Sequence, residues 1–270
     1  MKLRASLLLL LLLAAPVRAQ TGTEVCRSSE KLLQDVNGAL RKGGLAAVEP
    51  LVPAMQQAVT DAGACFPSIT NPDGSMVMLT DGSTESLMAV GSMAAKKVSG
   101  SAQFNPFPQL AFILGSYYNE TGKPQDALRT LDKGLSLSPF PDARLGATDF
   151  LLIAEKGAAF NALKRFDDAV QNYDEGLKLS HLDDGQRARM YRGRGFSMTE
   201  LGRLDDAENA YRESLKLAPG DTGALHELAY IAQLRHGRAP TEGYLTTTKP
   251  ATAEQDVPVE QRAKKPDAPN

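Results

Sequence analysis

The sequence predicts an all-α protein built as a solenoid of helical hairpins: three repeats, a capping helix and a helical N-terminal layer. Two observations predict this fold class. A segment with fixed internal spacing occurs three times in the middle of the chain. Apolar residues on either side of it recur at helical spacing, with Gly and Pro between the apolar stretches. The 270 residues, 42% of them hydrophobic, suffice to build a core for such a chain.

The first 19 residues have the pattern of a secretory signal peptide. Lys2 and Arg4 precede an apolar run over residues 5–17, and small residues follow up to Ala19. The run is shorter than a membrane-spanning helix needs, which argues against the alternative of an uncleaved anchor. We therefore expect cleavage near Ala19 and an exported protein, either periplasmic or secreted.

The net charge of the chain argues against some classes of binding partner. Loss of residues 1–19 would remove three basic residues and leave 27 against 32 acidic ones, a net charge of −5. A mildly acidic chain argues against nucleic acid or an anionic membrane as the partner. No second apolar run reaches about 18 residues, so we expect no transmembrane segment after cleavage.

Two cysteines flank a predicted helical hairpin near the N-terminus. Residues 32–40 and 45–55 show helical apolar spacing and are separated by two glycines. Cys26 stands at the start of the first helix and Cys65 just past the end of the second. Because antiparallel helices bring these ends together, and disulfides persist outside the cytosol, we predict a Cys26–Cys65 disulfide. The alternative, a reactive thiol pair, lacks a C-x-x-C spacing.

Residues 20–106 are expected to form a helical N-terminal region that packs on the first repeat. Within it, Ser75–Thr80 is interpreted as a short strand or an ordered loop, and residues 83–94 as a helix. Ser99–Pro108 is interpreted as a linking segment. Degenerate repeats remain an open interpretation of this region.

The repeat itself consists of small and large residues at constant spacing. An Ala near the start of each second helix is preceded by a Gly twelve residues earlier, and it is followed by a large residue four later and a small residue seven later. A Gly and a small residue let two helix backbones approach, and acids before the Ala favour a helix start. The three sets are Gly115, Ala127, Leu131 and Gly134; Gly157, Ala169, Tyr173 and Gly176; and Gly195, Ala207, Tyr211 and Ser214.

This pattern resembles the tetratricopeptide repeat family, in particular its exported bacterial members. The resemblance implies a solenoid over residues 107–237, with the last helix after Pro219 as a cap. The chain departs from the family in lacking the usual Trp and in spacing its copies by 42 and 38 residues. Residues 238–270 lack periodicity and are predicted to be a disordered tail.

No catalytic or metal-binding pattern stands out. The sequence lacks G-x-S-x-G, H-E-x-x-H, P-loop and G-x-G-x-x-G motifs. Its acid pairs, Asp167-Asp168 and Asp205-Asp206, fall at predicted helix starts, which explains them better than acid–base catalysis does. We therefore expect no enzyme, no cofactor and no metal.

The resemblance implies a concave groove, lined by the first helix of each repeat, that binds a protein or peptide. Arg189 and Arg192 would pair with carboxylates of the partner, or would form a solvated basic face with Asp183, Asp184 and Glu200. The family's clamp for a C-terminal carboxylate needs Lys and Asn in the first helix, and this chain has other residues there. Carried over by position, the groove residues are Phe112, Ser116, Asn119, Asn161, Arg189, Arg192, Phe196 and Tyr230.

The function predicted from the sequence is that of an exported, non-catalytic scaffold that holds a partner segment in this groove. Two alternatives stay open. The N-terminal region could bind a small ligand or act as an enzyme, with the repeats as its adaptor. The chain could also be a structural subunit that self-associates, since its oligomeric state does not follow from the sequence.

Overall fold

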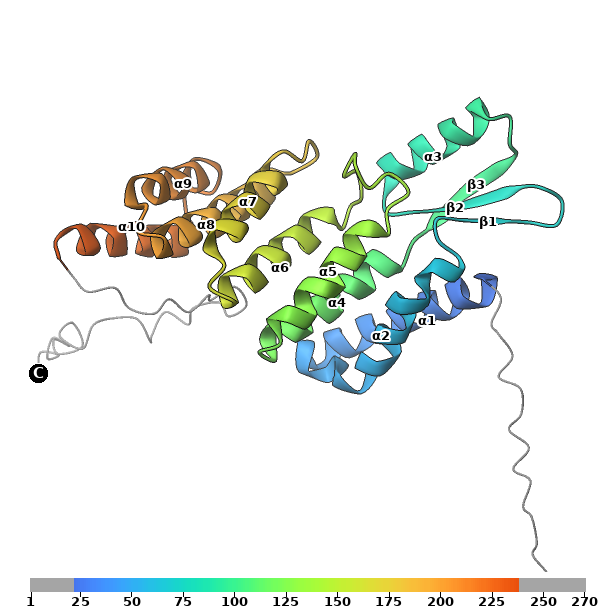
Figure 1. Ribbon diagram of the computed structural model, residues 1–270, viewed down its shortest axis with the longest axis horizontal. Coiled ribbons are helices and arrows are strands. Elements are labelled where there is room, and N and C mark those ends of the chain that lie inside the picture. The colour runs from blue at the N-terminus through green and yellow to red at the C-terminus, as the bar shows by residue number, and fades with distance from the viewer. Residues whose placement is uncertain (1–21, 238–270) are drawn as a thin grey trace, which may run out of the picture.

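The computed structural model describes residues 22–237, and helices dominate this part of the chain (Figure 1). The predicted signal peptide and the predicted tail lie outside the described residues. The helices are α1 (Gly22–Gly43), α2 (Val52–Asp61), α3 (Ser83–Ala95), α4 (Phe107–Glu120), α5 (Pro124–Ser136), α6 (Asp149–Ala162), α7 (Phe166–Leu177), α8 (Asp184–Glu200), α9 (Leu204–Leu217) and α10 (Thr222–Arg235). Two 3-10 helices, η1 (Leu45–Leu51) and η2 (Ala62–Ala64), and three strands, β1 (Ser68–Thr70), β2 (Met76–Thr80) and β3 (Gly100–Phe104), complete the order.

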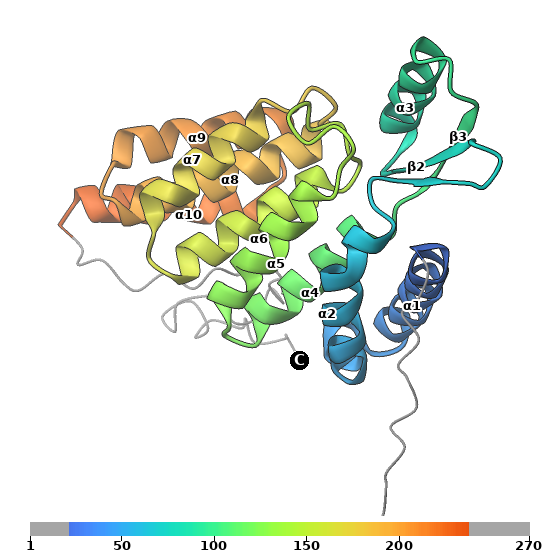
Figure 2. The same ribbon diagram turned by 45° about the vertical axis from the view of Figure 1, so that its right-hand side comes forward.

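Three antiparallel hairpins form the body of the molecule, and each packs against the next. The pairs are α4 with α5, α6 with α7, and α8 with α9, and α10 covers the last pair (Figure 2). The second helix of each pair also packs on the first helix of the following pair. The predicted solenoid of three repeats and a capping helix is confirmed.

Local sequence explains where the hairpins turn. Gly122 and Gly202 precede α5 and α9 with φ of 71°, and Lys164 takes the equivalent place before α7 with φ of 57°. These left-handed positions reverse the chain and favour glycine. The acid pairs then occupy the first turns of α7 and α9, near the positive end of each helix dipole, as expected.

Close helix approach depends on two glycines of the repeat pattern, Gly115 and Gly157, and on Gly193, which the pattern did not include. The ring of Tyr173 on α7 packs between Gly157 of α6 and Gly193 of α8. A Cβ atom at either glycine would stand 2.3 Å from the Tyr173 Cζ atom. Burial raises the pKa of the Tyr173 hydroxyl, which keeps the ring neutral between the helices. Gly115 makes the same kind of approach, since its Cβ would lie 2.5 Å from Leu131 Cδ2.

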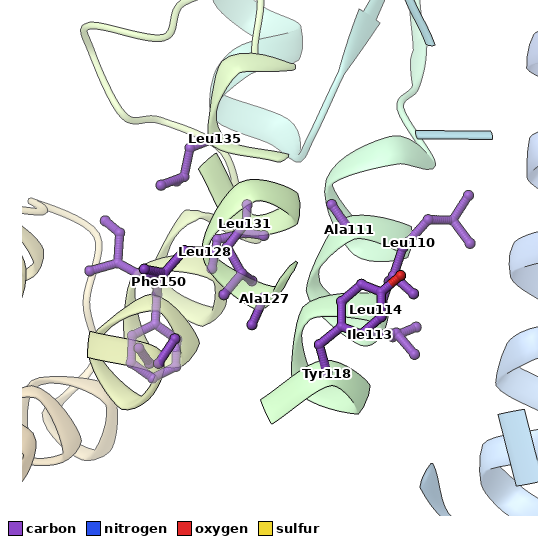
Figure 3. Packing of buried hydrophobic residues seen from close by; sticks show 14 of the residues in the cluster. Leu110, Ala111, Ile113, Leu114, Tyr118, Ala127, Leu128, Leu131, Leu135 and Phe150 are labelled. Atoms are coloured by element: carbon purple, nitrogen blue, oxygen red, sulfur yellow. The ribbon is translucent and has the colours of Figure 1, made fainter. Parts of the chain in front are cut away.

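A continuous apolar core runs through the first hairpins. Ala111 of α4 points toward Leu131 of α5, Leu110 lies on the side of α4 away from α5, and Phe150 of α6 continues the layer (Figure 3). Leu110, Leu114 and Leu131 are almost completely buried. The same core extends to the N-terminal hairpin through Val48 and Met55, so this hairpin and the repeats share one hydrophobic core.

The N-terminal hairpin continues the solenoid in the direction of the N-terminus. Its helix α2 packs against α4 as α5 packs against α6. Pro53 lies in the first turn of α2 and does not kink it, because the preceding residues form the separate 3-10 helix η1. The predicted Cys26–Cys65 disulfide is present, with a Cα–Cα distance of 6.2 Å.

The short strand interpreted at Ser75–Thr80 and the helix interpreted at residues 83–94 are present as β2 and α3, but the strands β1 and β3 were not expected in a helical N-terminal region. Residues 68–104 fold as a three-stranded sheet of order β1-β2-β3, with α3 crossing from β2 to β3. The pairing is antiparallel between β1 and β2 and parallel between β2 and β3. The segment Ser99–Pro108, interpreted as a link, contains β3, whose Gly and polar residues concealed its strand character in the sequence.

The glycine contacts around Tyr173 give a direct test of packing. We expect Gly157→Ala to lower the free energy of unfolding by about 1–3 kcal/mol, because the added methyl group overlaps the buried ring. Gly38→Ala is the matched control: it lies inside α1 with no atom near the added Cβ, and it should gain about 0.5–1 kcal/mol. Chemical denaturation of both variants measures the difference, and equal gains in stability would contradict the account.

Candidate functional site

The first helices of the three hairpins line a pocket of about 540 Å³. Helices α4, α6 and α8 contribute from the repeats, and the N-terminal hairpin closes one side with Leu40 and Leu45. Four of the eight predicted groove residues meet here: Phe112, Ser116, Asn119 and Arg189. The lining is more apolar than polar and consists of Leu40, Leu45, Phe112, Ile113, Ser116, Asn119, Glu120, Glu155, Ala158, Ala162 and Arg189.

Two polar atoms of the pocket lack a hydrogen-bond partner among the described residues. They are the hydroxyl oxygen of Ser116 and the side-chain oxygen of Asn119, both shielded from solvent. A polar atom held in this way loses its bonds to water without replacing them. A ligand group that donates a hydrogen bond would restore that lost interaction.

Asn119 is held in position by its amide nitrogen. Its Nδ2 donates to the backbone oxygen of Glu155 at 3.0 Å and to Glu155 Oε2 at 3.2 Å. These two bonds join α4 to α6 and fix the orientation of the amide. The Asn119 side chain therefore has a fixed position at the wall of the pocket.

Arg189 has its charge neutralised inside the protein. Its Nη2 atom donates to Glu155 Oε1 at 2.9 Å, and its guanidinium lies 5.7 Å from the centre of the Phe150 ring. The Glu155 side chain is only 8% exposed. A carboxylate from a partner would have to compete with this buried one, so Arg189 is already engaged as a structural ion pair.

Arg192 and Arg194 are also paired internally. Arg192 donates to Asp221, and Arg194 Nε lies 2.7 Å from Asp174 Oδ1. These acids are not the ones that the sequence suggested for the basic face, since Asp183 instead caps α8 by accepting from Gln186 N at 2.8 Å. The sequence could not identify these partners, because they come from neighbouring hairpins.

The remaining predicted groove residues lie outside the lining of this pocket. Asn161 is buried, and its side-chain oxygen accepts a hydrogen bond from the Ser197 hydroxyl at 2.8 Å. Phe196 on α8 and Tyr230 on α10 are partly buried. The structure therefore gathers half of the predicted set in one place and spreads the rest along the solenoid.

Sequence reasoning missed Glu155 and the N-terminal leucines of the pocket. Glu155 had a weak signal in the sequence, since Glu155 and Lys156 interrupt an otherwise apolar stretch of α6. No sequence signal marked Leu40 and Leu45, because their place in the pocket depends on how the N-terminal hairpin packs against α4.

A second candidate site is a cluster of three buried carboxyl groups where the sheet unit meets the loop between α5 and α6. Asp81 Oδ2 accepts from Thr148 N at 2.7 Å, and Asp149 Oδ2 accepts from Gly146 N at 3.1 Å. Glu85 accepts from Asp81 N at 2.7 Å and from the Ser138 hydroxyl. The bonds of Asp81 with Thr148 and of Glu85 with Ser138 join the unit to the repeats, so these carboxyl groups act as a structural clamp.

Burial raises the pKa of all three carboxyl groups, that of Asp149 to about 6. The Arg144 charge near Asp149 and the His181 charge near Asp81 oppose this effect without cancelling it. Among residues 22–237, no group of three or more His, Cys, Asp or Glu side chains has a geometry that could hold a metal ion. Nor is any helix in that range long and apolar enough to cross a membrane.

The fold and the groove define a helical-hairpin repeat protein. Residues 194–221, which span the end of α8 and all of α9, match the family model described as tetratricopeptide repeat. The match covers part of the third hairpin, and the first two hairpins have the same arrangement of helices and packing glycines as the third. No curated protein matches the sequence.

Solved structures with a similar arrangement are themselves tetratricopeptide domains. The first such domain of the human RPAP3 protein is 23% identical, with a TM-score of 0.42, over 48% of this chain and 93% of that one. The second domain, solved in complex with the HSP70 peptide SGPTIEEVD, is 23% identical with a TM-score of 0.39, over 46% and 98%. The Sgt2 domain from Aspergillus fumigatus is 12% identical with a TM-score of 0.42, over 54% and 93%.

The raised pKa of the buried Asp149 carboxyl group predicts that the stability of the fold decreases as the pH rises. The folded state keeps a proton on Asp149 up to about pH 6, whereas the unfolded chain loses it near pH 4. The folded state thus binds more protons between these values, and stability falls as the pH rises through this window. We expect Asp149→Asn to remove part of this fall and to gain about 1–3 kcal/mol at pH 7.

Unfolding midpoints measured from pH 4 to pH 7.5 test this expectation. Asp142→Asn is the matched control, because Asp142 is exposed on the same loop. If Asp149→Asn kept the wild-type pH profile and lost stability at pH 7, Asp149 would be an ionised group whose charge stabilises the fold.

Proposed function

We propose that this chain is a non-catalytic scaffold that holds an extended segment of a partner protein in the pocket between α4, α6 and α8. The observation that carries the proposal is the pair of unsatisfied polar atoms, on Ser116 and Asn119, inside a largely apolar pocket. An extended peptide supplies both chemistries at once: backbone N–H groups that donate hydrogen bonds and side chains that fill apolar space.

The charges around the pocket favour a neutral segment over an acidic one. Arg189 is neutralised by Glu155, and Glu120 adds a carboxylate at an exposed position of the lining. An acidic segment would face Glu120 and would have to displace Glu155 from Arg189. We therefore propose that an apolar side chain of the partner packs against Phe112 and Ile113 while its backbone donates to Asn119.

The groove is tested by selection from a phage-displayed library of random peptides on the purified chain. We expect selected peptides rich in apolar residues whose affinity falls about tenfold in Asn119→Ala, which corresponds to loss of one hydrogen bond. Asn209→Ala, at an exposed position on α9, is the matched control and should bind as the wild type does. Peptides that bind all three proteins equally would place the binding site elsewhere.

We further propose that the protein is exported and works in the periplasm or outside the cell. The basic start, the apolar run and the small residues before Gln20 support this location. The Cys26–Cys65 disulfide supports it as well, because such bonds persist mainly in oxidising compartments.

Mass spectrometry of the chain recovered from producing cells tests the location. We expect a protein that begins at Gln20 and takes up no thiol-alkylating reagent until it is reduced. A chain that retains Met1, or whose two cysteines react without reduction, would contradict the proposal.

A further inference from the structure

The sheet unit projects from the solenoid, with β3 at one edge of the sheet (Figures 1 and 2). Strand β3 contains neither a charged residue nor a proline, and four of its five residues are exposed. Natural sheets usually protect an edge with lysine, proline or a bulge, because unpaired backbone groups attract another strand. Strand β3 contains neither lysine nor proline, so its edge is suited to pairing with another strand.

The pairing of β3 with β2 shows which backbone groups of β3 are available. Met76 N donates to Ser99 O at 2.9 Å, and Asn105 N donates to Thr80 O at 2.9 Å. Alternate residues of a parallel strand bond to the same neighbour, so the odd-numbered residues from 99 to 105 face β2. The N–H and C=O groups of Gly100, Ala102 and Phe104 therefore point away from the sheet.

The helix above this edge has an uncovered apolar face. Helix α3 packs on β2 and β3 through Ala89 and Met93, yet Leu87 is 76% exposed and Val90 is 48% exposed. Phe104 on β3 is 44% exposed beside it. Four of the five exposed large hydrophobic side chains in residues 22–237 thus lie on this helix and strand. A group of large apolar side chains exposed together often marks an interaction surface.

We propose that a second copy of this chain pairs with this edge, β3 against β3 in antiparallel orientation around Ala102. Such a pair opposes Ala102 to Ala102 and Gly100 to Phe104 of the second copy. The three outward-facing residues of each strand would then exchange six backbone hydrogen bonds. Each exposed Phe104 ring would lie opposite Gly100 of the second copy, where the Met93 side chain already packs against the glycine.

The sequence of β3 favours a second copy over an unrelated strand. Its exposed aromatic residue and its glycine lie at equal distances on either side of Ala102, so the strand is complementary to itself under a twofold rotation. The absence of charge on β3 means that the rotation brings no like charges together.

Helix spacing supports the same arrangement. Strands in a sheet are about 4.8 Å apart, and α3 lies over β2 and β3. Joining two β3 strands would place the two α3 helices about 10 Å apart on one face of the joined sheet. That is the usual distance between packed helices, so the exposed apolar faces of α3 would cover each other.

The predicted interface is small and gives a dissociation constant on the order of micromolar. Its consequence is a dimer with two peptide grooves, which would bind a partner that has two suitable segments more tightly than one groove could. Dimerisation does not depend on the groove, so either proposal can fail without the other.

Light scattering after size-exclusion chromatography, over a concentration series of the cleaved chain, tests the dimer. We expect a concentration-dependent dimer whose dissociation constant rises at least tenfold in Ala102→Pro, which removes an outward N–H that the monomer does not use. We expect Leu87→Glu to raise the dissociation constant of the dimer by a similar factor. Leu225→Glu is the matched control, since Leu225 is exposed on α10 and should leave the dimer intact.

A single introduced thiol locates the interface. Cys26 and Cys65 are bridged, so Ala102→Cys adds the one reactive thiol of the described residues. A short bismaleimide should link two copies of Ala102→Cys but not two copies of Leu225→Cys. A wild-type chain that stays monomeric up to about 100 µM would overturn the proposal, and so would a dimer that survives both Ala102→Pro and Leu87→Glu with unchanged unfolding midpoints.

Discussion

The solenoid depends on helices that approach one another across glycine. Tyr173 fills the space that Gly157 and Gly193 leave open, and it thereby sets the distance between α6, α7 and α8. This spacing places the first helices of successive hairpins side by side, which is the geometry that creates the pocket. Because the pocket is a product of backbone packing, it exists before any ligand binds, and little binding energy is lost to reorganisation.

The sheet unit is joined to this scaffold by buried polar bonds as well as by apolar packing. Asp81 accepts a hydrogen bond from Thr148 N and Glu85 accepts one from the Ser138 hydroxyl, and Asn105 Nδ2 donates to Leu137 O at 2.6 Å. Hydrogen bonds of this kind fix orientation more strictly than apolar contact does. The unit can therefore project from the solenoid while its free edge, β3, keeps a defined direction relative to the groove.

Two surfaces with different chemistry result from this arrangement. The pocket combines apolar walls with acceptors, on Ser116 and Asn119, that lack donors within residues 22–237. The β3 edge combines outward backbone groups with the apolar face of α3. The first suits an extended segment from another protein, and the second suits a copy of itself. The buried ion pair of Arg189 with Glu155 serves the scaffold and leaves the pocket without a free charge at that position.

The sequence by itself determined the repeats, the capping helix and the disulfide, because each depends on local spacing: packing glycines, helix starts, and cysteines at the two ends of one hairpin. Four groove residues that meet in one pocket also followed from that periodicity. Only the tertiary structure decided that residues 68–104 form a sheet, that Leu40 and Leu45 line the pocket, and that Arg189 is paired with Glu155. These features join segments that are distant in the chain, and strand pairing and ion pairing at such separations leave no periodic trace in the sequence.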